Sequence, residues 1–241
     1  MPRSDGFLRP IPPANTYFTH AETQWEALYE GYELTESASA ELLKQRHQPQ
    51  WTGKQDIKEW LHLNLINQMI PQAYRGAFLI ALWATYETTV RMVSKQLHWF
   101  DRSTAPYSPP RNKDWLSWTK AYYDNELRFS LFPPGVHGIQ NEVTAVHRIR
   151  HVFVHGNGLR EAASGTQWGF LKKYARKHRE IIRVDRGYLA VTPEFVRGSF
   201  KTMGLAIAHV TETGRERLTA NPDFIEHETG WRPPKKQKIR R

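Results

Sequence analysis

"RGAFLIALWATYETTVRMVSKQLHWF", residues 75 to 100, forms one helix-length segment whose first half is apolar on all sides. A helix that is hydrophobic all round is buried, so this segment predicts the central helix of a helical bundle. Its longest unbroken apolar run, 77–84, is far shorter than the roughly 18 residues that a membrane-spanning helix needs. The sequence therefore predicts a buried core helix and no membrane association.

Amphipathic helices are expected on both sides of this segment, because apolar residues recur there every three or four positions. Pro71 is expected to interrupt the helix that precedes residue 75, since a proline inside a helix removes a hydrogen bond and clashes with the preceding turn. Thr192 and Pro193 have the residue types that favour the N-cap and the first turn of the last helix. The predicted helical ranges are 22–46, 57–69, 139–155 and 193–210.

The rest of the chain contains linkers and a small β element. Two proline-rich stretches, 101–113 and 132–138, predict linkers, with an aromatic helix between them. "EIIRVDRGYLAV", 180–191, predicts two short strands around an Asp-Arg-Gly turn. The predicted fold class is mainly α, a helical bundle with a small β-hairpin insertion near the C-terminal part.

Three segments are expected in the domain organisation. Residues 1–54 predict an N-terminal helical extension, 55–215 the helical bundle, and 216–241 a basic, disordered tail. Six of the last ten residues, "RPPKKQKIRR", are basic. This composition fits either a solubilising tail or a contact with nucleic acid.

Charge and cysteine content limit the function classes. Lysine and arginine number 34 against 24 aspartates and glutamates, so the net charge is +10, which favours a polyanionic partner. The absence of cysteine excludes disulfides, thiolate metal sites and a cysteine nucleophile. With no apolar stretch typical of a secretory signal, a cytoplasmic location is expected.

A second motif, "HRIRHVFVHGNG" at 147–158, gathers histidine and arginine at the end of a predicted helix. Three interpretations compete. A metal could bind a pair of histidines four residues apart, but His147 and His155 are separated by roughly 11–12 Å along a helix, so the three histidines cannot hold one ion. Alternatively, the side chains form a solvated polar face of a packed helix.

The third interpretation is cleavage of RNA phosphodiesters. Transesterification needs a base for the 2′-hydroxyl, an acid for the leaving 5′-oxygen, and a cation over the charged phosphorane. Histidine suits both proton-transfer roles near neutral pH, and the planar guanidinium of arginine binds phosphate through two hydrogen bonds. This chemistry requires no metal or cofactor.

These residues resemble the HEPN superfamily, which is defined by an arginine followed after four to six residues by a histidine. "RIRHVFVHGNG" looks especially like the version found in RiboL-PSP-type HEPN proteins, with Arg150 and His155 as the matching catalytic pair. Arg148 and His155 satisfy the longer spacing, so spacing alone leaves open which arginine contacts the phosphate. Arg150 is expected to do so because it matches the family's register, with Arg148 as a supporting phosphate contact. The resemblance covers roughly residues 55–215, and its specific part is this short motif.

The resemblance implies a homodimer in which two motifs face each other across one cleft and form a metal-independent endoribonuclease. Many members are toxins or effectors of anti-phage defence, so RNA, a second copy and an antitoxin or defence-system protein are the partners that it implies. Other members are catalytically inactive modules that bind nucleic acid or a partner protein. That class is the alternative prediction for this chain.

The other residues expected to support the site each have a second explanation. His151 stands where the family commonly has asparagine, which either removes an orienting hydrogen bond or adds a second imidazole four residues before His155. Asn157 is a candidate of the site but is most simply a turn residue, because asparagine tolerates a left-handed backbone. Trp168 and Tyr174 could stack on unpaired bases or belong to the core.

Two glutamates are also candidates. Glu87, on the apolar helix, either orients a group of the site or pairs locally with Arg91, four residues on. Glu142 either supports Arg150 across the helix or is simply exposed.

Overall fold

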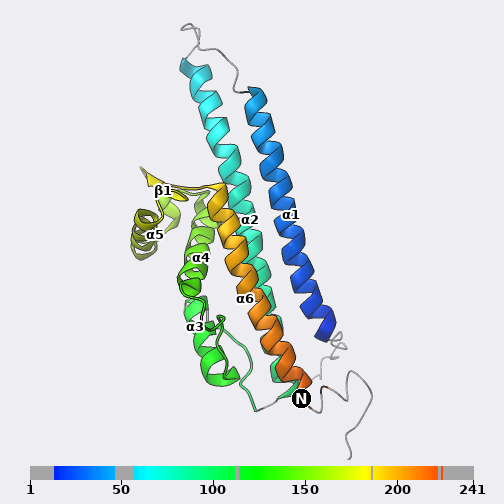
Figure 1. Ribbon diagram of the computed structural model, residues 1–241. Coiled ribbons are helices and arrows are strands. Elements are labelled where there is room, and N and C mark those ends of the chain that lie inside the picture. Colours follow the sequence, from blue (N-terminus) through cyan, green and yellow to red (C-terminus); the bar gives the residue numbers. More distant parts are fainter. Residues whose placement is uncertain are drawn as a thin grey trace, which may run out of the picture. The chain divides into compact units, whose positions relative to one another are not determined.

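The computed structural model describes residues 14–46, 57–101, 103–111, 114–185, 187–221 and 224, and these residues are mainly helical (Figure 1). A two-stranded antiparallel hairpin lies late in the chain. The predicted fold class, mainly α with a small hairpin, is confirmed. In chain order the elements are α1 (Ala14–Arg46), α2 (Ile57–Phe100), α3 (Trp115–Tyr122), the π-helical turn η1 (Tyr123–Leu127), α4 (Ile139–Gly156), the 3-10 turn η2 (Arg160–Ala162), α5 (Gly165–Lys177), β1 (Ile182–Asp185), β2 (Tyr188–Val191) and α6 (Pro193–Thr219).

Helix α2 is longer than predicted, because it continues through Pro71. The expected interruption at Pro71 is wrong. Proline removes only one N–H donor from a helix, and the next residue is anchored by tertiary hydrogen bonds. The side chain of Gln72 donates to the Val191 carbonyl at 3.0 Å and accepts from the Val191 N–H at 2.8 Å. Helix α1 also begins earlier than the predicted residue 22.

The hairpin and the start of α6 agree with the sequence. Ile182 pairs with Val191 and Asp185 with Tyr188, and Gly187 in the connection has a φ of +84°. Glycine populates positive φ at little cost, which explains its use here. The hydroxyl of Thr192 accepts the Phe195 N–H at 3.3 Å, so Thr192 caps α6 as predicted.

The described chain forms two compact units whose limits cut through α1, α2 and α6. One unit comprises 24–86 and 135–205, and the other comprises 1–23, 87–134 and 206–241. Each takes residues from more than one of the predicted segments 1–54, 55–215 and 216–241, and that division stays a prediction. Helix α6 extends to Thr219, while most of the predicted tail lies outside the described residues.

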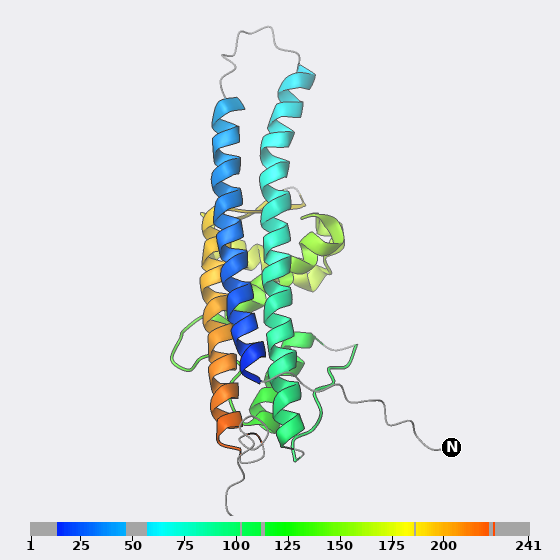
Figure 2. The ribbon, with the colours of Figure 1, turned by 90° about the vertical axis from the view of Figure 1, so that its right-hand side faces the viewer.

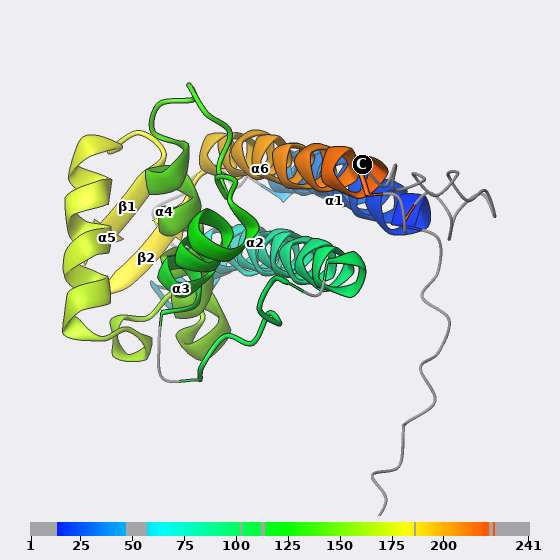
Figure 3. The same ribbon diagram turned by 90° about the horizontal axis from the view of Figure 1, so that it is seen from below.

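The unit formed by 24–86 and 135–205 contains the motif helix α4. Within it, α1 and α2 run side by side (Figure 2). Phe200 of α6 packs on Tyr29 and Tyr32 of α1, with ring centroids 5.4 and 5.7 Å apart. Helix α4 approaches α2 so closely that a Cβ at Gly76 would lie 2.5 Å from the Phe153 ring. The hairpin lies beside α5 (Figure 3).

A charged network also stabilises this unit. Arg75 of α2 donates to Glu36 of α1 from Nη2 at 2.6 Å and from Nε at 3.1 Å, and both side chains are almost completely buried. Tyr32 donates a further hydrogen bond to Glu36 at 3.1 Å. Arg75 Nη1 also donates to the Val191 carbonyl at 3.3 Å, so the network joins two helices to the hairpin. Buried charges paired in this way need not increase stability overall, but losing one partner is costly.

The other unit packs the C-terminal parts of α2 and α6 with α3 and η1. The Tyr123 hydroxyl donates to the Val90 carbonyl at 3.0 Å inside the core. Arg217 donates to the carbonyls of Leu127 and Arg128, the latter at 2.8 Å. In the described part of the chain, no helix combines the length and the hydropathy that crossing a bilayer requires.

Candidate functional site

Helix α4 presents the motif on a helix that is buried on one side. The buried side of α4 is an apolar stripe that includes Val143, Val146, Ile149 and Phe153. The helix is capped at its C-terminal end by Asn157, whose φ is +47°. Asparagine is among the few non-glycine residues that adopt this left-handed conformation readily. The interpretation of Asn157 as a turn residue is therefore confirmed.

The glycines on either side of Asn157 have different roles. Gly158 has a φ of +94°, and a Cβ there would lie 2.9 Å from the Leu189 carbonyl oxygen. Gly156 is still part of α4, and a Cβ there would lie only 2.5 Å from the Cβ of Ala162. Gly156 is thus needed for the close approach of η2 to α4.

His151 and His155 form a pair of imidazoles on this helix. Their ring centroids are 4.4 Å apart and the rings are tilted by 53°. His151 is partly buried and hydrogen-bonds to the Ala162 backbone, whereas His155 is exposed. Burial, followed by the charges of His155 and Arg150, lowers the pKa of His151 below its usual 6.5. The predicted second imidazole on the same face is present.

Arg150 carries a buried donor beside this pair. Its Nε atom is buried and has no hydrogen-bond partner among the described residues. Buried N–H groups without a partner cost free energy, so a native structure normally satisfies them with protein, water or ligand. Arg150 Nε is therefore a donor whose partner the described residues do not supply.

The structure separates the motif's remaining basic residues from the histidine pair. His147 stacks on Trp83 of α2, with ring centroids 4.4 Å apart and an angle of 21° between planes. The guanidinium carbon of Arg148 lies 4.4 Å from the centre of the Phe170 ring on α5. Residues seven apart on a helix lie almost in line, but this cation–π contact directs Arg148 toward α5 instead of toward His155. Among the described residues, no three histidine or carboxylate side chains gather in a group that could hold a metal ion.

The two candidate glutamates bond elsewhere. Glu142 accepts a short hydrogen bond from the Thr202 hydroxyl on α6 and none from Arg150. Glu87 pairs with Arg91 at 2.5 Å, so the local ion pair is confirmed. Glu87 also belongs to the other compact unit.

Ala162 could not be identified as part of the site from the spacing of residues in the sequence. It is an alanine outside the motif, and its backbone hydrogen-bonds to His151. Trp168 is buried with only 4% of its surface exposed, and Tyr174 stacks on His178 with centroids 4.3 Å apart. Of the two interpretations of Trp168, a base-stacking surface or a core residue, the second is confirmed, because core packing covers its ring.

Comparisons with protein-family models, with curated proteins and with solved structures find no match for the chain. The site is therefore interpreted from its own geometry. It contains a closely spaced imidazole pair, an adjacent arginine with a buried free donor, and a helix end fixed by backbone contacts to η2 and β2.

Proposed function

We propose that this protein is a metal-independent endoribonuclease of HEPN type that cleaves RNA by attack of the 2′-hydroxyl on the adjacent phosphodiester. The observation that carries the proposal is the imidazole pair, with centroids 4.4 Å apart, next to the buried, unpartnered Nε of Arg150. The proposed catalytic residues are His151, His155 and Arg150. Nothing in this chemistry needs a cofactor.

The pair suits the two proton transfers of this reaction. Two imidazoles in contact disfavour simultaneous protonation. The lowered pKa of His151 makes it the neutral member. We assign His151 as the base that accepts the proton of the 2′-hydroxyl, and His155 as the acid that donates a proton to the leaving 5′-oxygen.

Arg150 is assigned to the phosphate. As the 2′-oxygen bonds to phosphorus and the bond to the 5′-oxygen breaks, negative charge accumulates on the non-bridging oxygens. A guanidinium beside them stabilises that charge and satisfies the buried Nε donor. The products are a 2′,3′-cyclic phosphate and a free 5′-hydroxyl.

The proposed assembly and context follow from the resemblance to HEPN proteins. We propose a homodimer that acts in the cytoplasm on unpaired RNA, as a toxin or an anti-phage defence effector controlled by an antitoxin or defence-system protein. Unpaired strands allow the 2′-hydroxyl to align with the phosphate most easily. In the alternative proposal the chain is a catalytically inactive module that binds nucleic acid or a partner protein.

The test is cleavage of labelled single-stranded RNA by the purified chain in EDTA, with analysis of the product ends. We expect cyclic phosphate and 5′-hydroxyl ends from the parent chain. His155→Ala and Arg150→Ala should each lower the rate by about 100-fold or more, since removal of one such acid–base or charge-stabilising group costs that much. His147→Ala is the matched control, because His147 stacks on Trp83 and not on the pair.

Two results decide between the alternatives. An equal loss in His147→Ala would contradict the assignment, and no cleavage of any RNA would favour the inactive module. Mixing the His151→Ala and His155→Ala proteins locates the acid and the base. We expect no recovery of activity if one chain supplies both groups, whereas recovery would show that they act across a dimer.

A further inference from the structure

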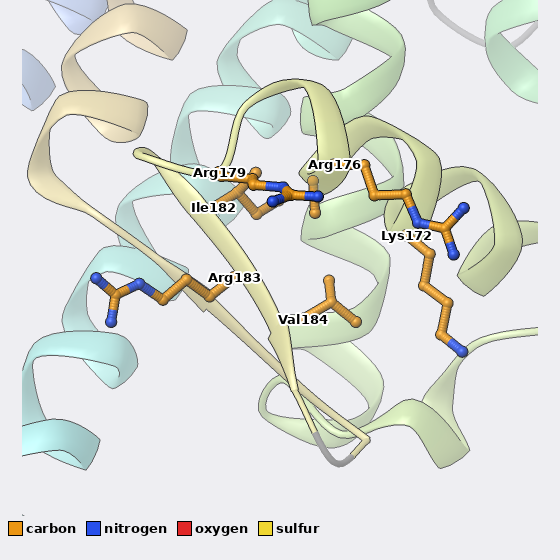
Figure 4. Close-up of a pocket in the computed structure, with 7 residues that line it drawn as sticks. Lys172, Arg176, Arg179, Ile182, Arg183 and Val184 are labelled. Carbon is orange, nitrogen blue, oxygen red and sulfur yellow. The ribbon is translucent and has the colours of Figure 1, made fainter.

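A basic cavity lies between α5 and β1, apart from the histidine pair. It has a volume of about 380 Å³ (Figure 4). The described residues that line it include no acidic side chain; they are Lys172, Ala175, Arg176, Arg179, Ile182, Arg183 and Val184.

The lining residues follow the helical repeat of α5 and the alternating pattern of β1. Lys172 and Arg176 are four residues apart, so they project from the same side of α5 on successive turns. Residues of a strand alternate between faces, which turns Ile182 and Val184 to one side of β1 and Arg183 to the other. In Figure 4 the side chain of Arg179 extends toward α5, whereas that of Arg183 points the opposite way.

The described residues do not neutralise three of the cations that line the cavity. Lys172, Arg176 and Arg179 are exposed, and none of them makes an ion pair or hydrogen bond with another residue in the described part of the chain. Elsewhere arginines are paired, as Arg75 is with Glu36 and Arg197 with Glu33. Three unneutralised cations around one hollow produce a positive potential that attracts an anion.

We propose that this cavity binds the sugar–phosphate backbone of single-stranded RNA. Lys172, Arg176 and Arg179 contact phosphates, and the apolar floor of Ala175, Ile182 and Val184 contacts a sugar or base. The choice of RNA among polyanions rests on the proposed function. Since α5 also holds Arg148 through Phe170, the cavity belongs to an element that packs on the motif helix.

A membrane surface fits this cavity less well. Peripheral membrane binding combines cations with exposed apolar side chains that enter the bilayer. None of the large hydrophobic side chains that are exposed in the described residues lies between 165 and 185. A strand of phosphates needs no such insertion.

The experiment measures binding separately from cleavage. The probe is a fluorescein-labelled, fully 2′-O-methylated RNA oligonucleotide of mixed sequence, which lacks the attacking hydroxyl and cannot be cleaved by the proposed reaction. Fluorescence anisotropy with the full chain is recorded at several salt concentrations. Arg176→Ala/Arg179→Ala is the test variant, and Lys172→Gln/Arg176→Gln is a second one.

The expected result follows from the release of counterions. Each phosphate contact to a single strand contributes about 0.7 to the slope of log affinity against log salt. The double variants should therefore lower the slope by about 1.4 and weaken binding about tenfold or more at 0.1 M salt. All these side chains are exposed, so the thermal unfolding midpoint should stay unchanged.

A matched control removes equal charge from the same helix. Lys173→Ala/Lys177→Ala takes two exposed cations from α5 that do not line the cavity. This variant should retain the parent's affinity within about twofold, the scale of surface charges without a specific contact. An equal loss in this control would show diffuse attraction and overturn the proposal, as would unchanged binding in both test variants.

Two further probes separate the sources of phosphate. Inorganic phosphate at equal ionic strength should not displace the RNA, because it offers a single group to the cations. Vesicles of phosphatidylserine and phosphatidylcholine should show no binding that depends on Arg176 and Arg179. Displacement by phosphate, or vesicle binding lost in the test variant, would overturn the assignment to RNA. Loss of RNA cleavage with this binding intact would contradict only the proposed function.

Discussion

The imidazole rings of His151 and His155, one turn apart on α4, lie with their centroids 4.4 Å from each other. His151 is partly buried and bonded to the Ala162 backbone, while His155 is exposed, so the two rings have unlike environments. Different environments give two neighbouring titratable groups different pKa values. Such a difference allows one group to act as the acid and the other as the base.

The first prediction concerns the titration of His151. Its pKa is lowered by burial and then by the neighbouring charges of His155 and Arg150, so it should titrate below 6.5. His155→Asn removes the second cause and should raise the pKa of His151 part of the way back. NMR titration of the imidazole signals measures both values. A pKa for His151 above 6.5 in the parent chain would contradict the assignment of His151 as base.

The same shift affects stability with a definite sign. A histidine with a lowered pKa in the folded state binds its proton less readily there than in the unfolded chain. Its contribution to stability is therefore complete above pH 6.5 and is lost as the pH falls through the lowered value. His151→Asn should flatten the dependence of the unfolding free energy on pH in this window, measured with urea.

The second prediction tests the contact between Gly156 and Ala162. Gly156→Ala places a Cβ at 2.5 Å from the Ala162 Cβ, so it should displace η2 and cost about 1–3 kcal/mol of stability. RNA cleavage should fall as well, since Ala162 bonds to His151. The double variant Gly156→Ala/Ala162→Gly removes the clash and should recover most of both losses.

The matched control for that substitution is Gly169→Ala. Gly169 lies inside α5 with no atom within 4 Å of an added Cβ, so alanine should stabilise the chain by about 0.5–1 kcal/mol. Urea unfolding compares all the variants. A loss in Gly169→Ala, or no recovery in the double variant, would contradict the steric explanation.

The third prediction concerns the buried pair of Glu36 and Arg75. Arg75→Ala leaves the Glu36 carboxylate buried without its main partner and should cost about 3 kcal/mol or more. Glu36→Gln/Arg75→Met removes both charges and should cost less, because no unpaired charge remains. The difference in urea midpoints between the single and double variants measures this coupling. Equal costs would show that the pair acts only through packing.

Acid sensitivity provides a separate measurement of this pair. Burial by itself would raise the pKa of Glu36, but the hydrogen bonds and charge of Arg75, together with the hydrogen bond from Tyr32, outweigh it, and the pKa lies below its usual 4.5. The stability due to the charged Glu36 is thus present above pH 4.5 and is lost as the pH falls through the lowered value. Glu36→Gln should remove this part of the acid denaturation profile.

The fourth prediction concerns the turn that ends α4. Asn157→Gly should change stability by only a few tenths of a kcal/mol, whereas Asn157→Ala should cost about 1 kcal/mol, because its φ of +47° is strained for alanine. Gly158→Ala should cost more still, since its Cβ would also lie 2.9 Å from the Leu189 carbonyl oxygen. Thermal unfolding ranks the three variants, and a different order would contradict the conformational explanation.

Preferences of residues close together in the sequence determined several helices and the hairpin of this protein. The apolar period of 139–155 predicted α4, Thr192 and Pro193 predicted the start of α6, and 180–191 predicted the hairpin. These features depend on neighbours within a few residues, which is the range over which side-chain spacing and backbone preferences act. The spacing of four residues likewise places His151 and His155 on one face of a helix.

Only the tertiary structure decided what each of these side chains contacts. Gln72 bonds to Val191, which anchors α2 just beyond Pro71, and Phe170 draws Arg148 away from the histidine pair. Glu142 bonds to Thr202 on α6 and not to Arg150 on its own helix. These partners lie far from the motif residues in the sequence or on other elements. A side chain contacts these partners because folding buries the surfaces of two elements against each other. The spacing of residues within one segment does not show which elements will pack together.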